Sequence, residues 1–400
     1  MIPDLFLRAW SFSWPWSGAW IGTAAWAGAL LVLAYPLLAA AVHRRRLRAP
    51  RLAGRPSDAS APATVLLPLR DEEADAEPCI RSLLGQNAGP RLVAIDDGST
   101  DRTPEVLAAL ARESGRLQVV SAGPLPPGWR GKVHALEAGR RALAGASGRA
   151  AAPSGDPEWL LLTDADTRHH PDLLARAVAT AEGLGLGLLS VAGRQRAEGP
   201  GENLVVPGVF ALLDALVGDW RRAIGGELTL ANGQFILVRS TVLERIGGFG
   251  AIRFAALDDL ALARAVQACG ERTGFVRAPD LLEVRMYRGL RSALAGWRRT
   301  LGGIFGDRPG RAGALLAALL APPAVLALGA ATMPAAAFVA WGCAAGASAL
   351  FRLGTGNRVA WALLSPLDFL AVAYCLGGGV TDHRRGRLAP WKGRAMPLSP

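Results

Sequence analysis

Three long runs that are almost free of charged side chains constrain the fold of this chain more than any other feature. The first, 9–42, has no charged residue, and most of it is apolar enough to span a bilayer. The second, 312–351, is 40 residues long. One membrane helix needs roughly 20 residues, so this run predicts a hairpin that turns near 331–334. The third, 359–380, is interrupted by Asp368 alone. A membrane protein with a soluble middle is therefore predicted.

The basic residues indicate an orientation in the membrane. His43 follows the first apolar run and precedes six arginines, Arg44, Arg45, Arg46, Arg48, Arg51 and Arg55. The positive-inside rule places this side of the membrane, and the soluble middle with it, in the cytoplasm. Three further crossings would put the basic tail, 382–400, outside, against the same rule. We therefore expect one C-terminal run, the one with Pro366 and Asp368, to be interfacial or re-entrant.

The net charge of +11 narrows the classes of partner. Nucleic acid is not favoured, because the arginines cluster beside the apolar runs and the chain has only three tyrosines for base stacking. Anionic lipid headgroups and phosphate-bearing substrates fit this charge better. The four cysteines show no paired spacing, which agrees with a reducing compartment.

Apolar strand segments and helical segments alternate through the soluble middle. Strands are expected at 63–69, 91–95, 117–122 and 158–163, and helices at 75–85, 103–113, 132–143 and from Pro171 onwards. A small-residue stretch, 144–157, looks like an insertion. This alternation predicts an α/β fold with a mainly parallel sheet that is covered by helices on both faces.

Acidic residues follow three of the expected strands. They are Asp71 and Glu72, Asp96 and Asp97, and Asp164 and Asp166. The carboxyl ends of parallel strands share one edge, where ligands of such sheets bind. A cleft lined by three acidic pairs would repel a phosphate unless a cation lay between them. The Asp164-x-Asp166 pair is therefore predicted to hold a hard divalent ion, Mg²⁺ or Mn²⁺.

Two adjacent histidines, His169 and His170, raise the alternative of zinc. Neighbouring side chains in an extended segment point in opposite directions, and a proline follows at once, so a shared zinc site is disfavoured. We expect both histidines to be polar first-turn residues of the next helix, with Asp172 favoured by the positive end of that helix.

Lys132 is one of only two lysines among 44 basic residues, and it lies in a glycine-containing turn that opens a helix. A compact ammonium on a flexible stem suits a phosphate or ribose contact. Chance could equally leave a lysine here.

The second half of the soluble middle carries candidate acceptor-side residues. Asn232 and Gly233 are expected at a strand start, where the backbone could approach a sugar closely. Asp258 and Asp259 open a helix, where capping alone would explain them. The segment 288–306 is basic, with apolar residues at helical intervals, and is predicted to lie in the membrane interface.

Six motifs in this order and spacing resemble those of family 2 glycosyltransferases, which have a GT-A fold. They are LLPLRDEEADAEPCIRSLLGQ, VAIDDGSTDRT, GWRGKVHALEAG, LLLTDADTRHHPD, ANGQFILVRS and LDDLALARAV. The resemblance covers roughly residues 62–300. With the apolar runs and the tail RLAPWKGR, the chain is most similar to bacterial hopene-associated glycosyltransferases, which implies a multi-pass protein of the bacterial inner membrane.

The resemblance implies roles for particular residues. The donor would be a nucleotide-diphosphate sugar, usually a UDP-sugar, with Glu72 and Asp96 at the base and ribose and Asp97 beside them. Asp164 and Asp166 would hold Mg²⁺ or Mn²⁺ against the diphosphate. Asp71 and Arg102 stand where the family commonly has Asn and Gly, and these two departures lie on the nucleotide side of the motif set.

On the acceptor side, the resemblance makes Asp259 the general base of an inverting transfer, with Asp258 beside it. Trp297 and Arg298 resemble the family's aromatic–basic acceptor motif. The processive Gln-x-x-Arg-Trp form is absent, which favours the addition of one sugar to a lipid acceptor, in the hopanoid context that the subfamily implies.

The expected layout is an N-terminal membrane anchor at 1–43, a basic linker at 44–62, a GT-A domain at 63–288, an interfacial helix at 289–310, membrane segments at 311–381 and a basic tail at 382–400. Two alternatives stay open. The Asp-x-Asp strand also resembles phosphatases of the haloacid-dehalogenase type, although Thr167 and Arg168 depart from their motif. The other alternative is a non-enzymatic membrane scaffold.

Overall fold

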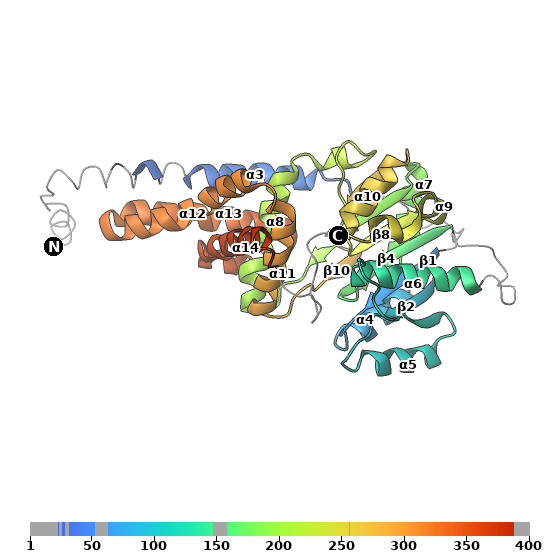
Figure 1. The fold of residues 1–400 in the computed structure, drawn as a ribbon. Coiled ribbons are helices and arrows are strands. Elements are labelled where there is room, and N and C mark those ends of the chain that lie inside the picture. The colour runs from blue at the N-terminus through green and yellow to red at the C-terminus, as the bar shows by residue number, and fades with distance from the viewer. Residues whose placement is uncertain are drawn as a thin grey trace, which may run out of the picture.

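The computed structural model describes residues 23, 26–28, 32–52, 63–146, 158–255 and 257–387. These residues form an α/β part, which holds the sheets, and a helical part beside it (Figure 1). Most of the expected N-terminal anchor, the end of the basic linker, most of the insertion at 144–157 and the end of the tail lie outside the described residues.

The main sheet has the mainly parallel order predicted. Its strands, in spatial order, are β3 (Leu117–Ser121), β2 (Arg91–Asp96), β1 (Ala63–Leu69), β4 (Trp159–Thr163), β8 (Phe235–Arg239), β6 (Leu188–Ala192) and β9 (Thr273–Arg277). Only β8 runs antiparallel to its neighbours β4 and β6, with Phe235 opposite Thr163. The start of β8 therefore lies at the same edge as the end of β4.

Helices cover both faces of this sheet because its strands are apolar on both sides. In β1, Val65 and Leu67 belong to one core and Leu66 to the other, as the two-residue period of a strand requires. One face is covered by α4 (Ala76–Leu84), α5 (Thr103–Glu113) and α7 (Leu173–Gly183). The other is covered by α6 (Gly131–Ala146), α9 (Ser240–Arg245), the 3₁₀ helix η2 (Gly248–Ile252) and α10 (Asp258–Ala268).

A small second sheet corrects the expectation for the two histidines. Its strands are β5 (Thr167–His169), β10 (Leu282–Val284) and β7 (Arg194–Gln195), with β10 in the middle. His169 is thus part of a strand and is buried, because the chain after the Asp-x-Asp pair forms a ladder with β10 before α7 begins at Leu173. His169 Nε2 lies 2.8 Å from Thr167 Oγ1, whereas His170 is exposed.

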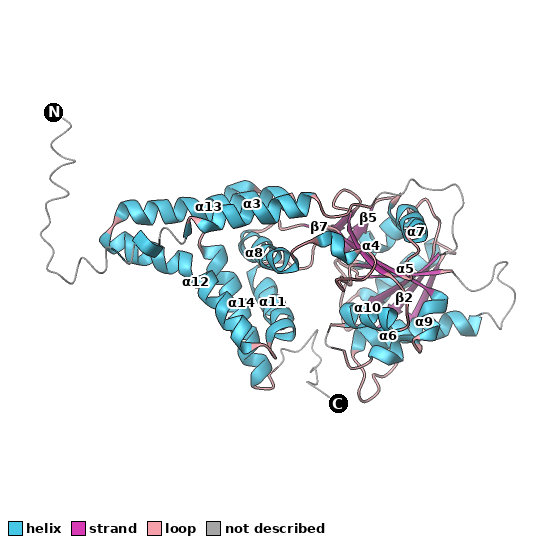
Figure 2. Ribbon diagram, turned by 90° about the horizontal axis from the view of Figure 1, so that it is seen from above, coloured by secondary structure: helices cyan, strands magenta, loops and turns pink. Residues whose placement is uncertain are grey.

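The helical part consists of long helices that lie beside the α/β part (Figure 2). They are α3 (Ala34–Leu47), α8 (Pro200–Val217), α11 (Leu290–Phe305), α12 (Pro309–Thr332), α13 (Pro334–Thr355) and α14 (Leu367–Arg384). The short 3₁₀ helices η1 (Trp220–Ala223) and η3 (Val359–Leu364) complete the described elements. The apolar run 312–351 forms the predicted hairpin, broken at Met333 between α12 and α13.

The helices α11 and α14 pack so closely that side chains are excluded at their crossing. A Cβ atom added to Gly302 would lie 2.7 Å from the carbonyl oxygen of Gly379. Around this crossing, Trp297 and Leu301 of α11 share a core with Val372 of α14. Small residues that let backbones approach are typical of helix packing in membranes.

The sequence did not predict that α8 belongs to the helical part. This helix comes from the range that the sequence assigns to the catalytic domain, yet Val205 and Val209 pack into the core of α11 and α14. Arg46 of α3 forms a buried ion pair with Asp214 of α8. This arginine, expected to face lipid headgroups, therefore joins two helices inside the protein.

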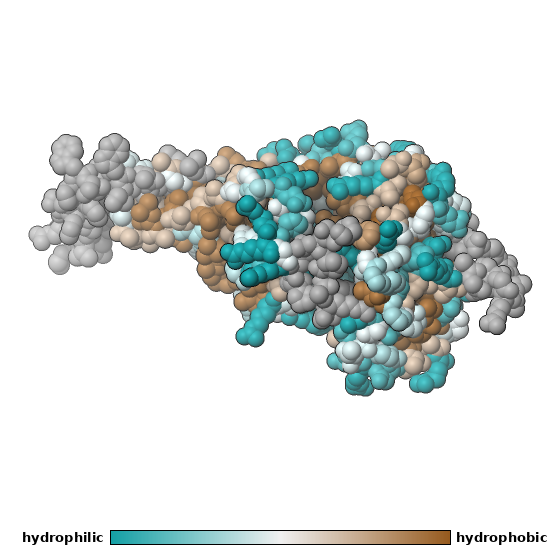
Figure 3. Space-filling model, viewed as in Figure 1, coloured by the Kyte–Doolittle hydropathy of each residue, from teal (hydrophilic) through white to brown (hydrophobic). Residues whose placement is uncertain are grey.

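Three of the described helices are long and apolar enough to cross a membrane: α8, α12 and α13. Only 11% of the most apolar part of α12 is buried, and its surface is hydrophobic (Figure 3). The third apolar run forms η3 and α14, and Asp368 is buried there, where it accepts a hydrogen bond from Ser348 Oγ over 2.7 Å.

Candidate active site

A cavity of about 1670 Å³ opens at the edge of the main sheet where β1, β2 and β4 end and β8 begins. The cavity extends from this edge to α8, α11 and the start of α12. The predicted residues that line it are Glu72, Asp97, Lys132, Asp164, Asp166, Asn232, Gly233, Asp258, Asp259 and Trp297. Asp96 and Arg298 are the two predicted site residues that do not line it.

Asp164 and Asp166 follow β4 directly, as predicted. Thr167 Oγ1 donates to the Asp164 carbonyl over 2.7 Å, and Arg285 N donates to the Asp166 carbonyl over 2.9 Å, so the loop between them is fixed from two sides. Asp166 Oδ1 is buried and has no hydrogen-bond partner among the described residues. Burial, then the carboxylates of Asp164 and Glu72, raise the pKa of Asp166 above its usual range.

Lys132 connects this loop to the predicted base. It lies in the first turn of α6, and its Nζ is 2.6 Å from Asp164 Oδ1 and 3.6 Å from Asp258 Oδ2. Burial alone would lower the pKa of Lys132, but Asp164 and Asp258 outweigh it and raise that pKa. The ammonium therefore stays charged and holds two acidic groups that come from opposite halves of the domain.

Asp259 lies in the first turn of α10 and is oriented by two backbone N–H groups. Leu260 N donates to Asp259 Oδ1 over 2.7 Å, and Gly233 N donates to Asp259 Oδ2 over 3.1 Å. Burial, and then the charge of Asp258, raise the pKa of Asp259 to about 6, although both hydrogen bonds act in the other direction. A carboxylate with such a pKa can accept a proton near neutral pH.

Gly233 lies against Lys132, so that any larger residue would have to displace the ammonium, a contact that the sequence did not reveal. A Cβ atom at this position would lie 2.8 Å from Lys132 Nζ and 3.5 Å from Asp164 Oδ2. The close approach of this backbone to a sugar stays a prediction, and the structure adds that the ammonium of Lys132 lies against Gly233. Asn232 stands beside Gly233, and its Oδ1 accepts from Gln234 N over 3.0 Å, which shapes the turn into β8.

Of the residues predicted to contact the base and ribose of the nucleotide, two line the cavity and one does not. Asp97 is 1% exposed and lines the cavity together with Glu72. Asp96 instead turns towards its own loop, where Oδ1 accepts from Ser99 N over 3.1 Å and from Ser99 Oγ over 2.6 Å. Asp96 therefore shapes the loop that presents Asp97.

Trp297 and Arg298, the two residues predicted to bind the acceptor, also differ in whether they line the cavity. Trp297 lines the cavity, but Arg298 is directed at α14, where it pairs with Asp382 and its Nη1 donates to Tyr374 Oη over 3.1 Å. Consecutive residues on a helix point about 100° apart, so the two side chains face different neighbours.

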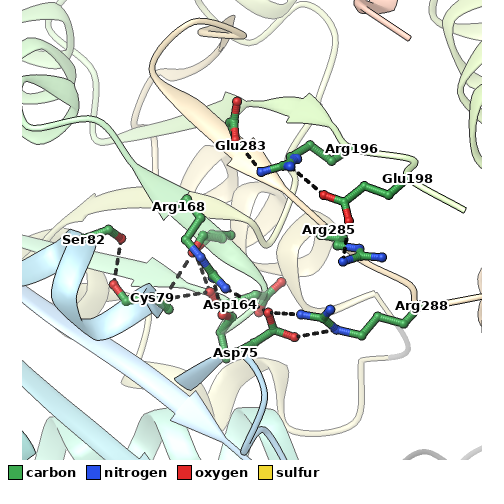
Figure 4. A network of polar contacts seen from close by, with 12 residues as sticks. Asp75, Cys79, Ser82, Asp164, Arg168, Arg196, Glu198, Glu283, Arg285 and Arg288 are labelled. Atoms are coloured by element: carbon green, nitrogen blue, oxygen red, sulfur yellow. Dashed lines mark hydrogen bonds and ion pairs between the residues drawn. The ribbon is translucent and has the colours of Figure 1, made fainter. Parts of the chain in front are cut away.

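Sequence reasoning missed an ion-pair network at the cavity wall. Asp75 accepts from Arg168 Nη2 over 2.9 Å and from Arg288 Nη2 over 2.8 Å, and both arginines point at it in Figure 4. Arg285 pairs with Glu198 over 2.7 Å and with Glu202 over 3.2 Å. The one sequence signal for this network is the pair of arginines, Arg285 and Arg288, between β10 and α11. No local pattern marks Asp75, whose partner Arg288 is 213 positions away.

Comparison with known proteins identifies the domain that holds these residues. A family model named glycosyl transferase family 2 matches residues 64–260. The beta-monoglucosyldiacylglycerol synthases of Nostoc sp. (strain PCC 7120 / SAG 25.82 / UTEX 2576) and Trichormus variabilis (strain ATCC 29413 / PCC 7937) are each 30% identical to this chain over 192 residues. The match covers 46% of this chain and 37% of each relative, so the chain spans well under half the length of these curated relatives.

Among solved structures, the mannosyltransferase PcManGT from Pyrobaculum calidifontis, in complex with GDP-Man and Mn²⁺, superimposes with a TM-score of 0.54 at 23% identity. The superposition covers 90% of this chain and 98% of that chain, and it shows a common fold. The matched family model and the named relatives favour a glycosyltransferase over the phosphatase alternative. The residues that build the cavity edge between β1 and α10 thus belong to a glycosyltransferase family 2 domain with a GT-A-like α/β fold.

Proposed function

We propose that this protein transfers a single sugar from a nucleotide-diphosphate sugar, a UDP-sugar in the first instance, to a lipid acceptor, with inversion at the anomeric carbon. The observation that carries this proposal is the position of Lys132, whose Nζ contacts Asp164 Oδ1 at 2.6 Å and Asp258 Oδ2 at 3.6 Å. Groups suited to the leaving diphosphate and to the attacking hydroxyl are thereby held within one cavity.

A divalent cation fits the residues present. Asp166 has a buried Oδ1 without a hydrogen-bond partner among the described residues, and the crowding of Asp164 and Glu72 disfavours its charge. Asp164 and Asp166 would hold Mg²⁺ or Mn²⁺, which when bound neutralises the negative charge of a diphosphate. The described residues include no cluster of three or more His, Cys, Asp or Glu side chains suited to a metal, so oxygens of the donor would complete the coordination.

The chain's own groups account for the remaining requirements of the reaction. The bond from the anomeric carbon to the diphosphate oxygen breaks as the acceptor oxygen bonds to that carbon, and the acceptor proton moves to the Asp259 carboxylate. Asp259 suits this role because Gly233 N and Leu260 N orient both of its oxygens. Lys132 keeps its positive charge next to the departing diphosphate, while Glu72 and Asp97 line the side of the cavity proposed for the nucleoside.

A lipid acceptor is supported by the shape of the cavity. It continues from the carboxylates to Trp297, Ile304 and Phe305 of α11 and to Phe210 of α8. The two curated relatives are named as synthases of a glucosylated diacylglycerol, and α12 and α13 are long and apolar enough for a bilayer. We place the protein in the bacterial inner membrane, with the α/β part on the cytoplasmic side. A hopanoid-type acceptor is the narrower form of the proposal.

The test is sugar transfer by the purified full-length protein in detergent. The protein is incubated with radiolabelled UDP-sugars or GDP-sugars and with total bacterial lipids, hopanoid lipids or diacylglycerol. The lipid products are then separated, and their masses are determined by mass spectrometry. We expect a lipid product heavier by one hexose, formed with Mg²⁺ or Mn²⁺ and not with a chelator. Asp166→Ala should remove the metal dependence of nucleotide binding, measured by calorimetry. Nucleotide binding without transfer to any lipid would favour the scaffold alternative.

A further inference from the structure

One face of α11 lines the part of the cavity that lies away from the main sheet, the far branch. The residues of α11 that line the cavity are Ser292, Ala295, Gly296, Trp297, Arg299, Thr300, Gly303, Ile304 and Phe305. Apart from Trp297 and Phe305, they recur at intervals of three and four, which places them on a single face. Five of these seven residues are Ser, Ala, Gly or Thr, so the face leaves space, and Arg299 carries its only charge.

The described part of the chain provides no counter-ion for Arg299 in this branch. Arg299 forms no hydrogen bond and no ion pair with any residue in the described part of the chain. Burial lowers the pKa of Arg299, and the only opposing influence comes from the phenol of Tyr287. Arg299 is half-buried, and a guanidinium that has lost part of its hydration and has no counter-ion favours the binding of a ligand anion.

Tyr287 links Arg299 to the reaction centre. Its ring lies against α11, where a Cβ atom on Gly296 would be 2.4 Å from the phenol oxygen. Burial raises the pKa of Tyr287 to about 12, with Arg299 acting against this and Asp166 in support. Tyr287, Arg299 and Asp166 all line the same cavity, so the guanidinium shares one space with the predicted site of sugar transfer.

A second, independent observation points to a ligand in the same branch. Trp297 is 3% exposed and lines the cavity, but its indole Nε1–H is buried and finds no acceptor among the described residues. Buried N–H groups in native proteins normally have an acceptor, so a missing one among the described residues indicates a partner beyond them, for which a ligand in the cavity is our candidate.

Two more arginines extend the positive charge towards the start of α12. Arg308 and Arg311 line the cavity, are exposed, and have no ion-pair partner in the described part of the chain. Asp307 lies among them, but His383 Nε2 is 3.0 Å from its Oδ1. Because α12 is a candidate membrane span, these arginines would stand at the level of lipid headgroups.

We infer that this branch, formed by Trp297, Arg299, Arg308 and Arg311, binds the phosphate group of an anionic lipid acceptor. The inference rests on the proposed lipid glycosylation and deepens it: the acceptor would carry a phosphodiester beside the hydroxyl that receives the sugar. Arg299 would pair with the phosphate and Trp297 Nε1–H would donate to it, while the neighbouring hydroxyl reaches Asp259. A neutral diacylglycerol would leave both donors without a partner.

The experiment compares acceptors that differ in the phosphate alone. The full-length protein in a neutral detergent receives phosphatidylglycerol or a diacylglycerol with the same acyl chains, and a parallel pair consists of polyprenyl phosphate and polyprenol. We expect kcat/KM for phosphatidylglycerol to exceed that for diacylglycerol. Arg299→Gln should lower the phosphatidylglycerol value about 10–100-fold, the usual worth of a hydrogen bond to a charged group, and should leave diacylglycerol unchanged.

Two variants serve as controls. Arg291→Gln removes the same charge from an exposed position of α11 that does not line the cavity, and should change neither acceptor. Arg299→Lys should restore part of the preference for phosphatidylglycerol, which a purely structural role of the guanidinium would not predict. Calorimetric binding of short-chain phosphatidylglycerol, with nucleotide present, provides a readout that does not need sugar transfer.

Each outcome is decisive. Equal rates for the charged and neutral acceptors, or an equal loss for both in Arg299→Gln, would overturn the inference while lipid glycosylation stands. A weaker affinity for the nucleotide-sugar in Arg299→Gln would assign the arginine to the donor and overturn it as well. A preference for polyprenyl phosphate over both polyprenol and phosphatidylglycerol would support the phosphate site and show that its ligand is a phosphomonoester. Failure to transfer sugar to any lipid, with phosphatidylglycerol still bound through Arg299, would overturn the proposed function alone.

Discussion

The backbone N–H of Gly233 donates a hydrogen bond to Asp259 Oδ2 over 3.1 Å, and this contact joins the strand that begins beside the Asp-x-Asp loop to the helix that carries the predicted base. Because β8 runs antiparallel to β4, residues that precede one strand meet residues that follow the other. The orientation of Asp259 therefore depends on a strand that is not adjacent to it in sequence.

Asp259→Asn should lower turnover about 10²–10⁴-fold, the usual contribution of a positioned base, because the amide cannot accept the acceptor proton. Nucleotide-sugar affinity should change little, since Asp259 forms hydrogen bonds with Gly233 and Leu260 on the acceptor side. Single-turnover rates and calorimetry measure the two effects. If Asp258→Asn loses activity while Asp259→Asn keeps it, the base is Asp258.

Turnover should depend on pH through the same residue. Burial and Asp258 raise the pKa of Asp259 to about 6, and the carboxylate is the form that accepts the proton. The value of kcat should therefore be constant above about pH 7 and decrease about tenfold per unit below pH 6. In Asp258→Asn the inflection should move to lower pH, because a negative neighbour is removed. An upward or absent shift would contradict the electrostatic coupling of the two carboxylates.

Gly233→Ala tests the close approach between Gly233 and Lys132. The new methyl group would lie 2.8 Å from Lys132 Nζ and should displace the ammonium from Asp164. A displacement of about 1 Å near the reacting groups can cost on the order of 100-fold in rate, which is the expected decrease in kcat. Gly115→Ala is the matched control, because a Cβ atom at Gly115 meets nothing within 4 Å. Equal activity of the two variants would exclude a role for the position of Lys132.

Arg298→Ala should affect stability more than acceptor binding. The arginine joins α11 to Asp382 and Tyr374 of α14, and its loss should lower the free energy of unfolding by about 1–3 kcal/mol. Thermal unfolding in detergent and the KM for the lipid acceptor separate the two roles. Arg291→Ala, on the same helix, is the control. A raised KM with unchanged stability would restore the acceptor role that the sequence motif suggested.

The membrane topology of α12 and α13 can be tested with one cysteine. If both helices cross, the turn between them lies on the opposite side of the membrane from the α/β part. With Cys269 and Cys343 replaced by Ala, a cysteine at Ala331 should react with a membrane-impermeant maleimide applied to right-side-out cells, and one at Glu105 in α5 should not. Labelling at Glu105 would place the α/β part outside the cytoplasm.

The sequence predicted those parts of the site that local patterns encode. Apolar strands that end in acidic residues located Asp164 and Asp166, because the carboxyl edge of a parallel sheet follows from strand direction alone. The helical hairpin followed in the same way from the length of one uncharged run and from Pro334 at its turn.

Other features of the site depend on the direction in which a side chain turns or on contacts between distant residues. Two adjacent aspartates do not show in the sequence that Asp96 bonds to Ser99 in its own turn while Asp97 lines the cavity. Trp297 and Arg298 are neighbours in a motif, but the rotation of a helix separates them. The position of α8 in the helical part depends on α11 and α14, whose sequences follow it by more than seventy residues.

The placement of α8 has a consequence for the order in which the site is completed during synthesis. Glu72, Asp97, Lys132 and the Asp-x-Asp loop all leave the ribosome before α8, whereas Gly233 and Asp259 follow it. The partners of α8 in α11 and α14 follow later still. A nascent chain would thus possess the residues proposed for the donor before the proposed base Asp259, and Asp259 before the helices that complete the cavity. Under the proposed function, the acceptor side of the cavity would therefore stay incomplete until α11 and α14 have been made.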